Sequence, residues 1–232
     1  LMYKIARREG IGDLLAEGVM RAAQKIGGEA PRMAIHTMKG NTPRGHDHRA
    51  RWMELFDTAV SDTGTLEVGP AFNMPADTLE ALGIEKIQES FSPEQVVRFS
   101  AQASGGMLFE DSLGVCRFNT QTDVIYLTKA VNAAMGWDMT PQEALKAGRR
   151  AMNLLRAFNI RHGVGPELDR PSERYGSTPV DGPAEGISIQ PHWEKMRRDY
   201  YQRLGWDEKG VPKRETLEAL GLGYVADDLD LA

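Results

Sequence analysis

Two short segments with the same pattern determine where long helices can begin. Each places a hydroxyl residue before a proline and a Gln or Glu three positions after the hydroxyl: SPEQ at 92–95 and TPQE at 140–143. The hydroxyl caps a free backbone N–H, and proline suits the first helical position because its missing N–H is not needed there. The two segments predict one helix over residues 93–110 and another over 141–161, the second closed by Gly163.

The rest of the chain adds helical patterns and few strand signals. The spacing of apolar residues and the positions of glycine and proline predict further helices at 13–26, 123–135, 191–204 and 215–220. The second of these is expected to be buried, and 215–220 is expected to be the last. Short strands are indicated at 68–72 and 187–189. We therefore predict a mainly α fold.

Three long segments lack a helical pattern and are expected to be functional or extended. They are residues 39–51, 62–75 and 166–191. Loops of this length are uncommon in compact domains unless they carry function. The third is rich in proline, glycine, serine and charge, which predicts an extended surface strap.

Charge and cysteine content exclude several classes of protein. The net charge of −5 gives no overall basic field for nucleic acid. A single cysteine excludes an internal disulfide and fits a reducing compartment, so a cytoplasmic location is expected. No apolar run approaches the roughly 20 residues that span a bilayer, so no membrane partner is expected.

The single cysteine lies in the segment DSLGVC, residues 111–116. One interpretation is a small buried hydrophobic residue in a glycine turn, which is the usual environment of a free cysteine. The other is that Cys116 is a ligand or nucleophile and that Asp111 shares its role. Gly114 would permit the close approach of a flat ligand. A carboxylate, a glycine and a thiolate within six residues would suit an N–H-rich heterocycle beside a metal–sulfur centre.

Two further loops contain candidate polar groups. His46 and His48 flank Asp47, so a metal is conceivable, but the spacing is weak and a solvated or substrate-facing loop is favoured. The loop SDTGTLEVG at 61–69 contains Glu67. Glu67 is either exposed or, if it is buried beside a cofactor, an acid or base with a raised pKa.

Several stretches, in this order, resemble the C-terminal part of the aldehyde:ferredoxin oxidoreductase family of tungsten–pterin enzymes. They are REGIGDLLAEGVMRAAQKIG, KG with HDHR, DSLGVC, the strap DRPSERYGSTPVDGPAEG and YYQRLGWDEKGVPKRETLEALGL. The resemblance covers nearly the whole chain, and DSLGVC and GWDEKGVP are its most specific parts. It implies a partial central helical domain over 1–90 and a C-terminal helical domain over 91–232.

The resemblance assigns roles to the residues of DSLGVC. It implies that Asp111 and Val115 hold a tungstopterin or molybdopterin, with Gly114 allowing its approach. It also implies that Cys116 is the last ligand of a [4Fe–4S] cluster and that Arg117 lies beside the contact of cluster and pterin. Four thiolates are the usual set for such a cluster.

The sequence departs from the family pattern in the two polar loops. Thr63 stands where the family often has a pterin-binding Arg, and Glu67 stands where it often has a proton-transferring His. HDHR at 46–49 replaces a common Tyr-Asp-Pro-Arg. Glu67 or His46 could move protons here. The departures indicate a divergent branch, and one such branch reduces aromatic acyl-CoA thioesters.

The sequence lacks the C-x-x-C-x-x-x-C run that supplies the other cluster ligands in the family. It also begins abruptly at Leu1, within a helical pattern. We therefore expect a piece of a longer chain that alone binds neither cofactor. The first interpretation is part of an oxidoreductase that oxidises aldehydes to carboxylic acids. Its expected partners are ferredoxin or another electron-transfer protein, the missing N-terminal domain and, in a homo-oligomer, a second copy. The second interpretation is a cofactor-free helical structural or interaction domain.

Overall fold

The computed structural model describes residues 1–64 and 74–230, and these are mainly helical, as predicted. Within them no extended strand forms, and the only bridges are the isolated pairs Thr37–Pro171 and Trp206–Pro212. The strand predicted at 187–189 is wrong, because these residues lie in a loop that buries Ile189. The strand predicted at 68–72 falls outside the described residues.

The helices follow one another with short connections except around the long loops. Their bounds are α1 Met2–Arg7, α2 Ile11–Leu15, α3 Gly18–Ile26, α4 Ala30–Met33, α5 Trp52–Val60, α6 Ala76–Ala81, α7 Pro93–Gln102, α8 Gly106–Ser112, α9 Arg117–Thr120, α10 Val124–Met135, α11 Pro141–Arg161, α12 Trp193–Arg203, α13 Arg214–Ala219 and α14 Gly223–Asp228. Three short 3-10 turns are η1 His48–Ala50, η2 Gly182–Ala184 and η3 Gln190–His192.

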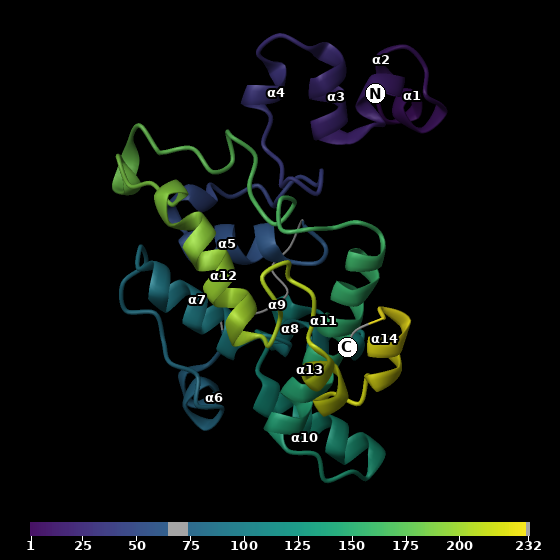
Figure 1. The fold of residues 1–232 in the computed structure, drawn as a ribbon, viewed down its shortest axis with the longest axis vertical. Helices are drawn as coiled ribbons and strands as arrows, with labels where there is room; N and C mark the ends of the chain where they lie inside the picture. The colour runs from purple at the N-terminus through teal and green to yellow at the C-terminus, as the bar shows by residue number, and fades with distance from the viewer. Residues whose placement is uncertain (65–73, 231–232) are drawn as a thin grey trace.

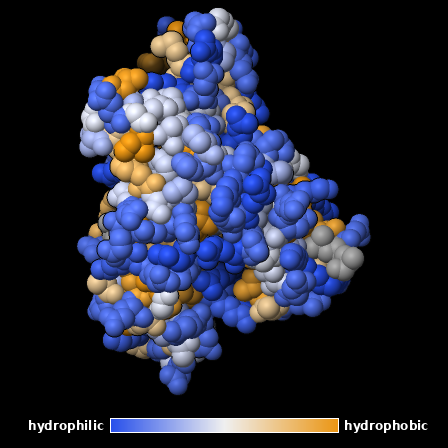
Figure 2. All heavy atoms as spheres, turned by 60° about the vertical axis from the view of Figure 1, so that its left-hand side comes forward, coloured by the Kyte–Doolittle hydropathy of each residue, from blue (hydrophilic) through white to orange (hydrophobic). Residues whose placement is uncertain are grey.

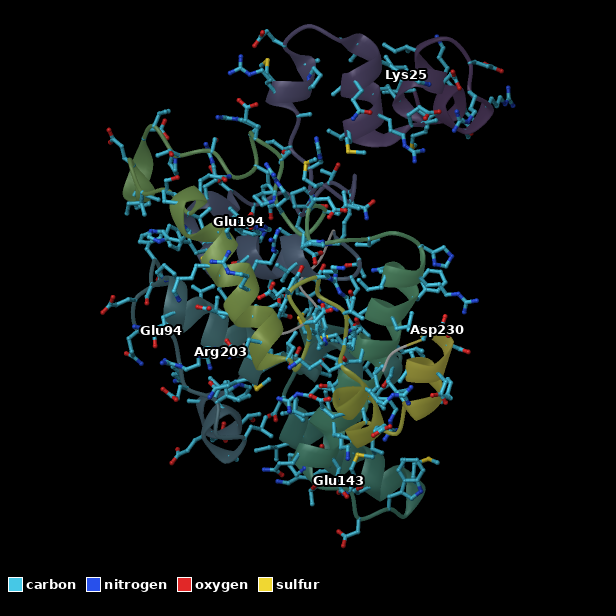
Figure 3. The ribbon with its side chains drawn as sticks, viewed as in Figure 1. Lys25, Glu94, Glu143, Glu194, Arg203 and Asp230 are labelled. Carbon is cyan, nitrogen blue, oxygen red and sulfur yellow. The ribbon has the colours of Figure 1, made fainter. Side chains whose placement is uncertain are left out.

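The helices form an upper tier and a larger body (Figure 1). Helices α1–α4, which include Lys25 in Figure 3, make up the upper tier. The chain after α4 joins this tier to the body, and the strap at 166–191 fastens it there. Ser172 Oγ donates a hydrogen bond to the Ala34 carbonyl, and the Met38 N–H donates to the Arg170 carbonyl. The strap is therefore a structural link between the two tiers.

The body is held together by two large hydrophobic cores. In the first, α5, α7 and α12 pack around aromatic side chains, and the Phe56 ring lies 5.4 Å from both the Trp193 and the Tyr200 ring. In the second, α7, α8, α10 and α11 bury Phe99, Met107 and Leu145 among other apolar residues. Helix α7 contributes to both cores, so the body is continuous around it. The division of the chain near residue 90 stays a prediction.

The two predicted long helices begin as expected, but the first is interrupted. Thr140 and Glu143 form a complete capping box at the start of α11. The helix predicted over 93–110 is wrong in its middle: α7 ends at Gln102, and α8 begins after Gly105, which has a φ of 88°. This break lets α11 approach closely. A Cβ on Gly148 of α11 would lie 1.8 Å from the Gly105 carbonyl oxygen.

Other predicted elements need smaller corrections. The helix predicted over 13–26 is two helices, because α2 ends at Leu15 and α3 begins at Gly18. Helix α10 is not a buried helix, since only three of its 12 residues are buried. The helix predicted at 215–220 is α13, but it is followed by α14.

The face of the molecule drawn in Figure 2 is mostly polar. Figure 2 shows apolar side chains at scattered places on a face that is otherwise hydrophilic. Among the described residues, no helix is both long enough and apolar enough to cross a bilayer.

Candidate cofactor-binding site

The segment DSLGVC forms a turn between α8 and α9, which we call the α8–α9 bend (residues 111–117). Asp111 lies in the last turn of α8, Cys116 is the N-cap of α9, and Arg117 is the first residue of α9. Gly114 turns the chain with a φ of 68°. Helix α8 packs against α11 and lies next to α9, which follows it directly (Figure 1). The structure thus brings the predicted cofactor residues of this segment together.

The thiol of the bend is exposed. Cys116 is a free, exposed cysteine, so the interpretation as a small buried hydrophobic residue is wrong. The neighbouring Val115 is 40% exposed and Phe118 is 81% exposed. A Cβ added to Gly114 would meet no atom within 4 Å. The thiol and the glycine backbone are therefore accessible to a ligand.

The carboxylate of the bend is fixed in place. Arg117 donates from one nitrogen to both carboxylate oxygens of Asp111, at 2.9 Å each. The preceding residue, Glu110, is buried, and its Oε2 accepts a 2.5 Å hydrogen bond from Thr122 Oγ1. Each carboxylate oxygen has more than one lone pair. Asp111 can therefore still accept an N–H from a heterocycle while Arg117 orients it.

The residues present fit a contribution to a pterin and a cluster. Cys116 can supply one thiolate of the usual four for a [4Fe–4S] cluster, and Asp111 can accept N–H groups. The accessible backbone at Gly114 leaves room for a flat ring. One thiolate cannot hold a cluster, so in such a site the other ligands would come from outside the 232 residues of this chain.

The loop that contains Thr63 is held against residues 37–41. Thr37 Oγ1 donates to the Gly64 carbonyl at 2.8 Å, and Asn41 Nδ2 donates to the Thr63 carbonyl at 2.6 Å. The Thr63 side chain is exposed and its hydroxyl lies 3.3 Å from Ser61 Oγ. Glu67 lies outside the described residues.

His46 and His48 come together with Glu54 rather than with Asp47. His48 and Glu54 are buried, whereas the His46 side chain is 52% exposed. Asp47 instead pairs with Arg49 at 2.6 Å, and the hydrogen bond from Arg49 lowers its pKa. Sequence reasoning missed Glu54, because it lies in an apolar helix six residues beyond His48.

The structure also contains a group of buried charges, which we call the buried charge cluster: Lys39, Asp62, Arg156, Asp169 and Tyr201. Asp169 pairs with Lys39 and, at 2.8 Å, with Arg156, and it accepts a hydrogen bond from the Tyr201 hydroxyl. Burial lowers the pKa of Lys39, and burial raises the pKa of Asp62 to about 7.

Sequence reasoning missed this cluster because it assigned residue 169 to a surface strap. Asp169 is in fact fully buried, and the strap is fastened to α12 beside it. Arg197 donates to the Pro166 carbonyl at 2.6 Å and pairs with Glu194, which is labelled near the start of α12 (Figure 3).

Helix α11 contacts both the turn before α8 and the loop that contains Thr63. Near its start, Gly148 packs on the turn before α8, and near its end Asn159 donates a 2.8 Å hydrogen bond to the Asp62 carbonyl. A helical rise of 1.5 Å per residue separates these two contacts by about 16 Å along the helix axis. The turn before α8 and the loop of Thr63 therefore contact different levels of the same helix.

A family model described as "Aldehyde ferredoxin oxidoreductase, domains 2 & 3" matches residues 1–222. The chain belongs to this family. The recognition made from the sequence is thus confirmed, and so is the helical fold class.

Relatives of known name are similar over nearly the whole chain. A tungsten-containing aldehyde ferredoxin oxidoreductase of Pyrococcus furiosus is 30% identical over 223 residues, which cover 94% of this chain and 35% of the relative. An aliphatic sulfonate oxidoreductase, WOR-like subunit, of the same organism is 30% identical over 241 residues, which cover 96% of this chain and 34% of the relative. The chain spans about a third of the length of these relatives.

A solved structure has the same fold. It is the active site complex of a benzoyl coenzyme A reductase with 1,5-dienoyl-CoA. The superposition has a TM-score of 0.68 at 23% identity and covers 98% of this chain and 39% of that chain. The helical arrangement described above is therefore one that occurs in a larger solved protein.

Proposed function

We propose that this chain is the helical part of a tungsten- or molybdenum-bispterin oxidoreductase with a [4Fe–4S] cluster. The complete enzyme would oxidise an aldehyde to a carboxylic acid with an oxygen atom from water; two protons would be released, and two electrons would leave through the cluster to ferredoxin. The observation that carries the proposal is the α8–α9 bend, where an exposed thiol and an oriented carboxylate lie five residues apart in a chain of this family.

The bend's proposed task is to position both cofactors. Cys116 holds one iron of the cluster, Asp111 accepts pterin N–H groups, and Arg117 keeps the carboxylate in place. Gly114 and Val115 present backbone and a small apolar surface to the ring. The metal and its dithiolene ligands supply the redox chemistry when bound, and the protein supplies binding, orientation and electrostatics.

The polar loops are proposed to transfer protons and, at Thr63, to contact the pterin. Thr63 offers an exposed hydroxyl where the family often has a basic residue. His46 and Glu67 are the proposed proton carriers for the water that is consumed. Asp62, beside Thr63, is an added candidate, because a carboxyl with a pKa of about 7 can both accept and donate protons near neutral pH.

Exposed apolar side chains support the proposal that a further domain of the enzyme covers part of this chain. Val115 and Phe118 are exposed at the bend, and Leu154, Leu155 and Phe158 are exposed on α11. We propose that the N-terminal domain of the family packs on these surfaces and supplies the remaining cluster ligands. The proposed electron acceptor is ferredoxin or a similar protein in the cytoplasm.

A second candidate, reduction of an aromatic acyl-CoA thioester, is favoured by the departures at Thr63, Glu67 and 46–49. An extra carboxylate near the metal would repel a carboxylate product but not a neutral ring. The same cofactors would serve in this case, with electrons entering through the cluster instead of leaving.

Assays on the protein distinguish the two candidate activities. The protein is expressed anaerobically from its complete coding sequence in tungstate medium. With aldehydes, we expect reduction of ferredoxin or a viologen dye, and loss of most turnover in Asp111→Asn. Glu194→Gln on the exposed start of α12 is the matched control. Conversion of benzoyl-CoA with inert aldehydes would favour the second candidate. A protein without iron or tungsten would indicate the cofactor-free structural domain.

A further inference from the structure

We infer that His46, His48 and Glu54 form a binding site for a divalent first-row transition metal of the zinc type. One ligand atom from each residue lies within 4.8 Å of the others. Glu54 Oε2 is 3.4 Å from His48 Nε2 and 3.7 Å from His46 Nδ1. Ligands held at about 2.1 Å in a tetrahedral zinc site are about 3.4 Å apart, so small movements of His46 would complete the set.

The groups behind the ligands hold them in the orientation that a metal needs. His48 Nδ1 lies 2.6 Å from the Tyr175 hydroxyl, which leaves Nε2 directed at Glu54. The second oxygen of the carboxylate, Glu54 Oε1, accepts a 2.9 Å hydrogen bond from Arg51. Such partners fix the tautomer and orientation of metal ligands, and their loss typically weakens metal binding about 10- to 100-fold.

Two of the proposed ligands are buried, and the third lies at an entrance. His48 lies in η1 and Glu54 in the first turn of α5, and their side chains are 0% and 6% exposed. Within the described residues, Glu54 Oε2 is buried and accepts no hydrogen bond. The half-exposed His46 and the buried His48 both line a cavity of about 360 Å³, through which a metal ion can enter.

The surrounding charges determine which cation can bind. Arg51 and, at 3.8 Å, Arg44 neutralise Glu54 in the metal-free chain, so an incoming cation has to compete with them. Two imidazoles favour zinc, cobalt, nickel or ferrous iron, whereas magnesium and calcium prefer oxygen ligands. The site does not need the cofactors of the oxidoreductase proposed above, but a metal on His46 would remove that residue from the proton transfer proposed there.

The test is zinc titration of the 232-residue chain by calorimetry at about pH 7.5, after treatment with a chelator. The variants are His46→Gln and Glu54→Gln, and His46 is exposed enough that its replacement leaves the core intact. His162→Gln, an exposed histidine at the end of α11, is the matched control, and Cys116→Ser tests the free thiol. Circular dichroism confirms that each variant is folded.

We expect one zinc per chain, unchanged binding in His162→Gln and Cys116→Ser, and binding at least about tenfold weaker in His46→Gln and Glu54→Gln. Cobalt in place of zinc should give visible absorption bands that weaken in the same two variants. The inference is overturned if the wild-type chain shows no saturable binding. It is also overturned if the cluster variants bind like the wild type, or if either control loses binding.

Discussion

The buried charge cluster and the α8–α9 bend both contain an aspartate paired with an arginine, but in opposite environments. The side chains of Asp169 and Arg156 are each 0% exposed, whereas those of Asp111 and Arg117 are 47% and 19% exposed. In the first, Lys39 and Tyr201 add further partners from distant parts of the chain. In the second, an exposed thiol lies alongside.

The difference shows which site the chain completes by itself. Folding brings residues 39, 156, 169 and 201 together, and each charge there meets an opposite charge or a hydrogen-bond partner. A buried charge without such partners would be costly. The bend instead keeps its carboxylate and thiol at the surface, where they remain available for a cofactor. We therefore assign Lys39, Arg156, Asp169 and Tyr201 to stability, and the bend remains the proposed functional site.

The largest expected loss of stability follows from breaking the buried charge cluster. Asp169→Ala leaves Lys39 and Arg156 buried without their common counter-ion. We expect a loss of about 5 kcal/mol in the free energy of unfolding, at the upper end of the range for broken buried ion pairs, or failure to fold. Urea denaturation of the purified chain measures it.

The matched variant in the bend is Asp111→Ala. An exposed ion pair is worth about 0.2–1 kcal/mol, so this variant should unfold at nearly the wild-type urea concentration. Equal losses in Asp169→Ala and Asp111→Ala would contradict the division into a stabilising and a functional site.

A somewhat smaller effect is expected from Asp62, whose stability contribution depends on pH. Burial raises its pKa from 3.8 to about 7, so the folded state favours the neutral carboxyl. Its contribution is complete below about pH 4, decreases as pH rises and is lost above about pH 7. Asp62→Asn stays neutral and should gain about 4 kcal/mol relative to wild type between pH 4 and pH 8, at about 1.4 kcal/mol per pKa unit.

Stability curves of both proteins at a series of pH values provide the measurement. Parallel curves for wild type and Asp62→Asn across this range would show that Asp62 is not held in its neutral form.

The smallest effect is expected at the thiol. Cys116 is exposed and is not packed in the core, so Cys116→Ser should change the free energy of unfolding of the 232-residue chain by less than about 0.5 kcal/mol. A loss of 2 kcal/mol or more, on the order of that for a buried side chain, would support a structural role for the cysteine.

Local signals were sufficient to predict where several helices begin, but not where they break or how they pack. The capping box at Thr140 and Glu143 depends on residues three apart, so the start of α11 was readable from the sequence. The break between α7 and α8 depends on the close approach of Gly105 to Gly148, which lies 43 positions later in the sequence. A contact between residues this far apart in the sequence cannot be predicted from sequence periodicity.

The candidate sites were likewise predictable only where their residues are close together in the sequence. The bend lies within seven residues, so its motif was enough to predict that Asp111, Cys116 and Arg117 lie together. Glu54 joined the two histidines only through the turn of η1 into α5, and Asp169 reached Lys39 from the strap. The sequence around such a residue gives no sign of a buried partner. This holds for Glu54 in an apolar helix and for Asp169 in a loop that was expected to be exposed.

The iron content of Cys116→Ala tests the central claim most directly. The protein is expressed anaerobically from its complete coding sequence, and iron and acid-labile sulfide are measured per chain in the variant and the wild type. We predict about four irons per chain in the wild type and loss of most of them in the variant, with tungsten binding less affected, since a [4Fe–4S] cluster usually needs four thiolates. A variant that keeps its full iron content and its cluster spectrum would contradict the assignment of Cys116 as a cluster ligand.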